Sequence, residues 1–377
     1  TPDMTLQFPD GIYLKTPLQV KVPEAVRNLK AVNLSFAERE GYSVQYAEGD
    51  SVATFVFHQS TDVDVEYSAV INGKRRYFTT AAWVYANTLE QPSIKFVTAN
   101  GSNYMVFVEA PMNGIVKAVE VSRQNPLTKQ YEVVGTANNG NGLIRFVDTT
   151  SENTLQAQSY RVRFVADNGV QKSELSATHT PLHLSVNQCT KGLNLIWNAY
   201  EGQKVGEYII RRGTTPKNCQ EIARVDGTTQ SYIDTGATAA DGYYYAVSFV
   251  TPEPADMLRE SWSNVVSSEQ VFAAQTLANT LALTTIEPTA ELTDAQPSLH
   301  LMAVVLPTFT DISKISWRVV EGGGIAQLLP TGELVRVNSL VGGKGNIVVE
   351  AHTLDGSALT TQLSIPYNLS GMATGIG

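Results

Sequence analysis

The stretch Ser231-Tyr-Ile-Asp-Thr-Gly236, followed by Tyr243-Tyr-Tyr-Ala-Val-Ser-Phe249, carries the strongest structural signal in the chain. Its first part predicts a short strand over 231–233 that ends at an Asp-Thr-Gly turn. Its second part predicts a strand that starts after the turn signal Asp241-Gly242 and alternates its side chains between two faces. The chain is therefore expected to consist of short strands joined by tight turns.

One face of the second predicted strand carries Tyr243, Tyr245, Val247 and Phe249. Tyr243 opens the strand directly after the corner. A tyrosine in this place is typical of the tyrosine corner of β-sandwiches, in which the hydroxyl bonds to nearby backbone. We predict that Tyr243 holds this corner.

Length and composition indicate several β domains. The 377 residues are too many for one sandwich, and domains of about 100 residues would make three or four of them. Hydrophobic residues make up 43% of the chain, as in ordinary globular domains, and the 16 Tyr and 12 Phe favour strands. The formal charge of −9 and the lack of a basic run argue against a nucleic-acid partner.

The sequence predicts no membrane span, because no apolar run approaches the roughly 18 residues that a span needs. The chain begins Thr1-Pro2-Asp3, without an initiator Met and without a signal-peptide pattern. We expect this start to be a processed end or the edge of a larger polypeptide. Export fits such a start, and so does a trimmed intracellular fragment.

Strand patterns and turn signals predict an all-β fold of four tandem β-sandwich domains that are Ig-like or fibronectin type III-like. The predicted domains are residues 1–90, 91–180, 181–272 and 273–369, followed by a flexible tail over 370–377.

The clearest local feature of the first domain is a hairpin that turns at Asn72-Gly73. Its first strand places Asp62, Asp64 and Glu66 on one face, opposite Val63, Val65 and Tyr67. Carboxylate oxygens in a row are calcium ligands in other proteins. We interpret this row instead as a solvated outer face that lies opposite a core face.

The third domain resembles a fibronectin type III domain in strand order and in residues over nearly its whole length. The matching residues are Trp197 in the second strand, Tyr208–Arg212 in the third, Tyr232–Thr235 before the corner, Tyr243–Val247 after it and Ser263–Val266 in the last strand. The second domain is similar to a divergent copy, with Tyr160-Arg-Val162 at the place of Tyr245-Ala-Val247. It departs from the pattern at Gln158, which takes the place of Tyr243, and at Phe107, which stands in the strand where Trp is expected.

The fourth domain, within residues 281–368, resembles bacterial Ig-like domains of group 2. The resemblance depends on the run Leu299–Thr308, the following strand with Trp317, the turn at Gly332 and the final run Gly345–Ala351. Both resemblances imply work at the cell surface or after secretion. They also place Trp197 and Trp317 in cores.

No residue set predicts catalysis. The five histidines, His58, His179, His183, His300 and His352, are scattered, and no HExxH, GxSxG or phosphate-binding glycine motif occurs. His179 and His183 straddle the boundary of the second and third domains, and we interpret them as exposed linker positions rather than as zinc ligands. We predict no enzyme, no cofactor and no metal.

The fibronectin type III topology would place Cys189 before the second strand and Cys219 after the third strand of its domain, at the same pole. A disulfide between them is a candidate. On the chain-entropy model it would stabilise the fold by roughly 3–4 kcal/mol, and it would imply export. Two free thiols in a reducing compartment are the alternative.

Three aromatic residues are candidates for binding. Trp262 lies near an edge strand of the third domain, at a place where the family has a small or polar residue, and would offer a flat surface to a sugar or a protein. Trp83 and Tyr85 lie near the end of the first domain. They are candidates for binding or for packing at the joint with the second domain.

These observations predict a non-enzymatic modular protein that acts in adhesion or as a scaffold or spacer. The protein is predicted to be secreted or to lie at the cell surface, and a periplasmic location is the alternative. The predicted partner is a protein or a glycan. A glycan-binding protein, or the accessory region of a polysaccharide-degrading enzyme, is the alternative. A subunit of an envelope or secretion complex is a further alternative.

Overall fold

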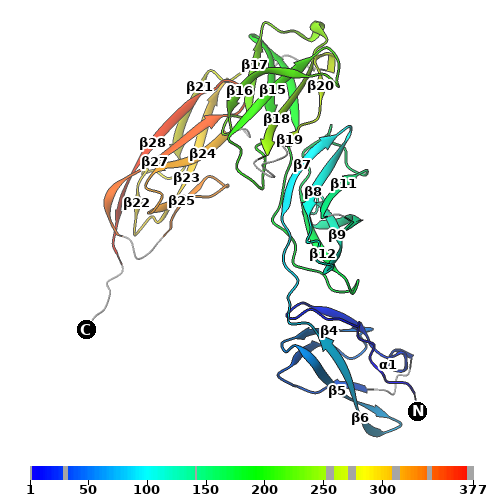
Figure 1. The fold of residues 1–377 in the computed structure, drawn as a ribbon. Coiled ribbons are helices and arrows are strands. Elements are labelled where there is room, and N and C mark those ends of the chain that lie inside the picture. The colour runs from blue at the N-terminus through cyan, green and yellow to red at the C-terminus, as the bar shows by residue number, and fades with distance from the viewer. Residues whose placement is uncertain are drawn as a thin grey trace. The chain divides into compact units, whose positions relative to one another are not determined.

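The fold is that of a computed structural model, which describes residues 2–28, 33–140, 142–251, 259–270, 277–307, 315–337 and 342–371. Strands dominate this part of the chain and form eight small sheets, which pair into tandem β-sandwiches (Figure 1). Its helical turns are short: α1 (Glu24–Asn28), η1 (Ala239–Asp241) and η2 (Ser268–Gln270). The predicted all-β class is confirmed. Within the described residues, no helix is long and apolar enough to cross a membrane.

The first sandwich pairs a sheet of order β1-β4-β3 with a sheet of order β2-β5-β6. Its strands are β1 (Leu18–Lys21), β2 (Asn33–Phe36), β3 (Tyr42–Gln45), β4 (Val52–Phe57), β5 (Thr61–Ile71) and β6 (Lys74–Val84). Both sheets contribute to one core, in which Phe55 of β4 and Val65 of β5 are fully buried. The alternation of buried and open positions along β4 and β5 follows from the period of two.

The hairpin of β5 and β6 forms as the sequence predicts. Asn72 and Gly73 have φ of 52° and 76°, as a type I′ turn requires, and Ile71 pairs with Lys74. Asp62 and Asp64 are exposed, whereas the alternate side chains, including Val65, are buried. The carboxylates therefore lie on the outer face of the sheet.

The second sandwich pairs sheets of order β11-β8-β7 and β10-β9-β12. Its strands are β7 (Ile94–Asn100), β8 (Asn103–Glu109), β9 (Val116–Gln124), β10 (Tyr131–Asn138), β11 (Leu143–Asp148) and β12 (Tyr160–Ala166). Its first, second and fifth strands form one sheet and its third, fourth and sixth form the other.

Buried hydrogen bonds join residues 11–16 to the loop over 167–171. The side chain of Gln171 is fully buried. It accepts from the backbone N–H of Tyr13 at 2.6 Å and donates to the carbonyls of Tyr13 and Thr16, each at 3.0 Å. Tyr13 also donates its hydroxyl to Asp167 at 3.0 Å. Because the Gln171 amide and its backbone partners are buried and paired, the contact holds the two segments in one arrangement.

The third sandwich has a sheet of order β13-β14-β17, and a second sheet in which β15 lies between β16 and β18 and β20 pairs with β18. Its strands are β13 (Leu184–Cys189), β14 (Gly192–Trp197), β15 (Glu207–Gly213), β16 (Gln220–Asp226), β17 (Ser231–Thr235), β18 (Tyr244–Thr251) and β20 (Val266–Ser267). Trp197 is buried and packs edge-on against Tyr208, with ring centroids 5.7 Å apart. The core position predicted for Trp197 is confirmed. The last strand expected over Ser263–Val266 is wrong, because β19 (Arg259–Trp262) ends before Ser263 and β20 begins only at Val266.

The fourth sandwich pairs sheets of order β21-β23-β26-β25 and β22-β28-β27-β24. Its strands are β21 (Thr280–Thr285), β22 (Leu292–Thr293), β23 (Ser298–Leu306), β24 (Ile315–Glu321), β25 (Ala326–Leu328), β26 (Glu333–Arg336), β27 (Gly343–Thr353) and β28 (Thr360–Leu369). Trp317 is partly buried and packs against the core, as predicted. Of the predicted tail, residues 372–377 lie outside the described residues, and Ser370 donates its backbone N–H to Asp294.

The chain divides into two compact units. The first comprises Thr1–Leu182, Tyr200–Lys204 and Val250–Asn264, and the second comprises His183–Ala199, Val205–Phe249 and Val265–Gly377. Two segments that belong by sequence to the predicted third domain are thus part of the first unit.

Strand β7 explains why the first unit includes those segments. The backbone N–H of Val97 donates to the hydroxyl of Tyr200 at 2.9 Å, and the hydroxyl of Ser261 donates to the carbonyl of Val97 at 2.6 Å. Trp262 donates its backbone N–H to the Thr98 hydroxyl at 2.9 Å. The two segments therefore complete the hydrogen bonding of β7.

The interpretation of His179 as an exposed linker residue is wrong. His179 is buried, its Nδ1 lies 2.7 Å from the hydroxyl of Tyr200, and its ring packs edge-on against the Tyr200 ring. Burial lowers the pKa of His179 to about 4. Because Tyr200 lies 21 residues further along the chain, local sequence gives no sign of this contact.

Candidate binding site on the first sandwich

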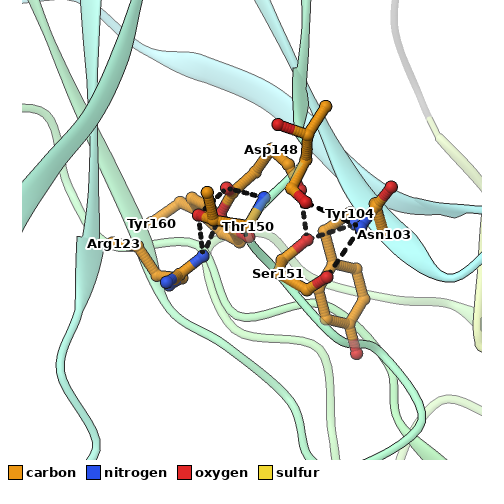
Figure 2. Close-up of polar contacts among 8 residues, drawn as sticks. Asn103, Tyr104, Arg123, Asp148, Thr150, Ser151 and Tyr160 are labelled. Atoms are coloured by element: carbon orange, nitrogen blue, oxygen red, sulfur yellow. Dashed lines mark hydrogen bonds and ion pairs between the residues drawn. The ribbon is translucent and has the colours of Figure 1, made fainter.

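A polar cluster in the first unit surrounds the carboxylate of Asp148, at the end of β11 (Figure 2). Asp148 accepts the hydroxyl of Tyr160 at 2.8 Å and the guanidinium of Arg123 at 2.6 Å, and it also accepts the hydroxyl of Thr150 at 2.7 Å. Asp148 is almost fully buried. Its oxygens are occupied by groups of the same sandwich, so the cluster fastens β9, β11 and β12 together rather than forming a reactive site.

The second unit repeats this cluster around Asp234, at the end of β17. Tyr245 donates its hydroxyl to Oδ2 of Asp234 at 2.5 Å, and Arg212 donates to the same oxygen at 2.9 Å. Burial raises the pKa of Tyr245, and the neighbouring Asp234 raises it further. The hydrogen bond from Arg212 to Asp234 raises the pKa of that guanidinium above its ordinary range. Tyr245 therefore keeps its proton and Arg212 its positive charge at neutral pH.

These clusters correct two predictions about the tyrosine corner. The corner tyrosine is Tyr245, not Tyr243, and its partner is a carboxylate rather than backbone. Tyr243 instead lies under the guanidinium of Arg212, which is 4.5 Å from its ring centroid. Because Tyr160 occupies the matching place in the second sandwich, Gln158 is not a departure from the pattern.

The two cysteines are free in the structure, so the candidate disulfide between Cys189 and Cys219 is not formed there. Cys189 ends β13 and pairs with Gly192 in one sheet. Cys219 precedes β16 of the other sheet, and its Sγ lies 3.6 Å from the carbonyl of Tyr244. Burial raises the pKa of the Cys219 thiol, which disfavours the reactive thiolate.

Among the described residues, no group of three or more His, Cys, Asp or Glu side chains is arranged to hold a metal ion. The contact most like a catalytic pair is that between the Ser43 hydroxyl and Nε2 of His58, at 3.1 Å on the exposed surface of the first sandwich. A catalytic pair of this kind needs a third group to orient the imidazole. In the described part of the chain no carboxylate contacts His58.

The three predicted binding residues lie in different surroundings. Trp262 is partly buried on β19, where its backbone is bonded to Thr98. Tyr85 is also partly buried, and its ring lies 5.3 Å from the ring of Tyr13. Trp83 is 47% exposed and projects from the outer face of β6. The structure therefore brings none of the three together, and only Trp83 presents a large open surface.

The residue that the sequence analysis missed is Tyr77, whose side chain is 80% exposed on β6. In the register of the hairpin, Tyr77 pairs with Ser68 and Trp83 pairs with Asp62. Directly paired residues of antiparallel strands lie on the same face, so both aromatic rings share the face of the acidic row. The two-residue turn at Asn72-Gly73 fixes this register, and it was the signal that could have revealed Tyr77.

A pocket with a volume of 230 Å³ lies beside Tyr77 and is lined by Ser35, Arg39, Glu66 and Ser68 among others. Three strands supply it, because Ser35 of β2 pairs with Ser68 of β5, which pairs with Tyr77 of β6. Arg39 and Glu66 form an ion pair and are both about half exposed, so each has hydrogen-bonding capacity left for a ligand. The pocket adjoins a groove of 540 Å³, with which it shares Ser35 and Arg39.

We call the outer surface of β5 and β6 the hairpin face. It carries two exposed aromatic rings, a row of carboxylates and the pocket beside Tyr77. Such a surface offers apolar ring faces for stacking and charged oxygen atoms as hydrogen-bond acceptors. This combination suits a ligand that is amphipathic and rich in hydroxyl groups.

Comparisons with known proteins do not assign a function. No family model matches the sequence, and no curated protein matches it. Solved structures that the chain matches include protocadherin gammaB7 EC3-6, with 12% identity and a TM-score of 0.19, covering 97% of this chain and 100% of that one. The chicken CNTN1 FN1-FN3 domains have 11% identity and a TM-score of 0.19, covering 71% of this chain and 96% of theirs. Protocadherin Gamma B2 extracellular cadherin domains 3-6 have 9% identity and a TM-score of 0.20, covering 97% and 99%. At this level of similarity, function has to be argued from the residues of the chain itself.

Proposed function

We propose that this chain is a non-enzymatic modular protein of the cell exterior, in which the first sandwich presents a ligand-binding surface. The following sandwiches serve as a scaffold that carries it. Tandem β-sandwiches host many unrelated functions, so the proposal depends on the site and not on the fold. We place the second and third sandwiches with the fibronectin type III family and the fourth with bacterial Ig-like domains of group 2, on the residues that carry those resemblances.

The observation that carries this proposal is the exposure of Tyr77, at 80%, beside a pocket with polar walls. An exposed aromatic ring contributes nothing to a core, whereas aromatic residues are enriched where proteins bind partners. Trp83 adds a second open ring on the same face. Two such rings on one sheet face, with charged groups between them, favour a binding surface over a plain spacer.

The test is binding of the fluorescently labelled full chain to intact cells and to extracellular matrix, compared with the double variant Tyr77→Ala/Trp83→Ala. Leu127→Ala is the matched control, because Leu127 is 90% exposed on the second sandwich. We expect binding to fall at least tenfold in the double variant and to stay unchanged in the control. Equal binding by the unaltered chain, the double variant and the control would mean that the hairpin face is not the binding surface. Incubation with soluble polysaccharides, followed by measurement of new reducing ends, tests the non-enzymatic part, and release of sugars would overturn it.

A glycan-binding protein, including the accessory region of a polysaccharide-degrading enzyme, is the second candidate. The observation that favours it is the mixture of aromatic rings, serine hydroxyls and carboxylates on the hairpin face. The same face would serve either role, since an adhesion module can bind glycans.

A further inference from the structure

The ligand class follows from the order of groups along β6. Tyr77 and Trp83 are six residues apart on one strand and one face, which separates them by about 20 Å at 3.3 Å per residue. Thr79 and Ala81 lie between them on that face, and both are exposed with small side chains. No large side chain of β6 therefore stands between the two rings on this face, so a single extended molecule can contact both rings.

The charges between the rings restrict what that molecule can be. Asp62, Asp64 and Glu66 line the neighbouring strand, opposite Trp83, Ala81 and Thr79. Arg39 pairs with Glu66, which leaves Asp62 and Asp64 as exposed charges on the path. Between the rings a polyanion would meet the like charges of Asp62 and Asp64, whereas the positive charges of Arg39 and Arg75, which donates to the Ser68 hydroxyl at 2.8 Å, lie at the Tyr77 end of the path. Neutral hydroxyl groups would donate hydrogen bonds to the carboxylates.

The pocket beside Tyr77 is small. Its volume of 230 Å³ lies below the roughly 300–1,000 Å³ typical of sites for drug-sized ligands. It therefore suits one ring of a chain rather than a whole compact molecule. Ser35 is exposed at its wall, and Arg39 and Glu66 supply a donor and an acceptor there.

We propose that the hairpin face binds a linear, neutral oligosaccharide, with one sugar ring against Tyr77 in the pocket and a later ring of the same chain against Trp83. The inference rests on the proposed function and names its ligand. The C–H face of a sugar ring packs on the aromatic ring, while its hydroxyls reach Asp62, Asp64 and Glu66. The carboxylates make the face selective, because they exclude acidic polysaccharides by repulsion.

The test uses the full chain and measures its affinity for neutral cello-, manno- and malto-oligosaccharides, from disaccharides to octasaccharides. Oligogalacturonate serves as the acidic counterpart. We expect at least one neutral series to bind, with octasaccharides bound more tightly than disaccharides. Tyr77→Ala should weaken binding of all lengths about tenfold, as expected when one aromatic anchor is lost. Trp83→Ala should weaken only the long chains, because disaccharides do not reach Trp83.

Three further variants separate stacking from other effects. Tyr77→Phe keeps the ring and should retain most of the affinity, while Leu127→Ala should change nothing. Asp62→Asn/Asp64→Asn should admit oligogalacturonate, which the unaltered face rejects. Thermal unfolding of each variant shows whether the first sandwich is intact, and Tyr77 and Trp83 are exposed enough that their loss should leave the unfolding temperature unchanged.

The outcomes separate this inference from the proposed function. If cell binding depends on Tyr77 and Trp83 but no neutral oligosaccharide binds, the ligand is of another class, such as a protein, and the oligosaccharide inference is overturned. Periodate treatment of the cells, which destroys sugar diols, would then leave binding intact where protease treatment abolishes it. Preference for oligogalacturonate, or equal effects of Trp83→Ala at every chain length, would also overturn the inference. Cell binding that is equally strong in the unaltered chain and in the double variant Tyr77→Ala/Trp83→Ala would overturn both proposals.

Discussion

Tyr245 donates its hydroxyl to Asp234 at 2.5 Å, and Tyr160 makes the same contact with Asp148 at 2.8 Å in the preceding sandwich. Both tyrosines are fully buried, and in both sandwiches an arginine binds the same carboxylate. Each aspartate lies at the end of the fifth strand and each tyrosine near the start of the sixth. The contact therefore ties together the two sheets of each sandwich at one corner.

Replacing Tyr245 by Phe should lower the free energy of unfolding by about 2 kcal/mol, because a hydrogen bond to a charged group is lost inside the protein. Differential scanning calorimetry of the full chain measures the effect. Tyr77→Phe removes a hydroxyl that faces solvent, and it should change the stability by less than about 0.5 kcal/mol. Equal shifts for the two variants would mean that the Tyr245 hydroxyl contributes nothing to the corner.

Acid should weaken the first unit through His179. Its pKa is about 4 in the folded state, below the ordinary value of 6.5. As the pH falls from 6.5 to 4, the unfolded chain binds a proton that the folded chain does not, so stability falls with pH across this window. The loss should reach about 3 kcal/mol and then level off below pH 4.

Urea unfolding between pH 4 and pH 7.5, followed by tryptophan fluorescence, measures this loss. His179→Gln should remove most of the pH dependence while keeping a polar partner for Tyr200. His58→Gln is the control, since His58 lies on the exposed surface. If the His179→Gln variant loses as much stability in acid as the unaltered protein, His179 is not the cause of the loss.

Gln171→Ala should loosen the contact between residues 13–16 and the loop over 167–171. The change leaves the backbone N–H of Tyr13 and the carbonyls of Tyr13 and Thr16 without their side-chain partner. Buried groups left unpaired in this way cost about 1–3 kcal/mol each. Hydrogen exchange at the Tyr13 amide should accelerate at least tenfold. Gln130→Ala, on the exposed surface, should leave that rate unchanged, and an unchanged rate in Gln171→Ala would refute the prediction.

Gly356→Ala should destabilise the second unit for two reasons that can be separated. Gly356 has a φ of +94°, which disfavours any residue with a Cβ, and a Cβ there would lie 2.4 Å from the side chain of Asn194. Gly49 has nearly the same φ of +93° but open space around it. Gly49→Ala should therefore cost about 1 kcal/mol from backbone strain alone. Calorimetry should show a larger loss of stability for Gly356→Ala than for Gly49→Ala. Equal losses of stability would mean that the Asn194 side chain moves away from the new Cβ without cost.

The sequence patterns located most strands because the period of two marks each half-buried ribbon. They could not show whether Tyr243 or Tyr245 is the corner tyrosine, since two residues that are two positions apart lie on the same face of a strand. The choice depends on Asp234, which lies 11 residues before Tyr245, just as Asp148 lies 12 residues before Tyr160. The recurrence of Asp-Thr at 148–149 and 234–235 was a signal of this pairing in the sequence.

The candidate site was predictable in part. The Asn72-Gly73 turn fixes the hairpin register, and the register places Tyr77 on the same face as Asp64. The pocket beside Tyr77 was not predictable, because Ser35 and Arg39 come from a strand and a loop whose approach to β5 depends on the packing of two sheets. The burial of His179 was hidden for the same reason, since Tyr200 reaches it from another part of the fold.

The bonds that complete β7 decide which fragments of this protein can be prepared. A polypeptide that stops at residue 180, where the sequence marks a domain boundary, would lose Tyr200 and Ser261 and leave both backbone groups of Val97 without their partners. The stacked rings of Phe96 and Phe107 would also lose Arg259, whose guanidinium lies 5.5 Å from the Phe107 ring. Such a fragment should expose apolar surface and self-associate. Expression of the binding face in a stable form therefore calls for a chain that extends through residue 264, because the first sandwich alone would also lose the bonds of Gln171 to Tyr13 and Thr16.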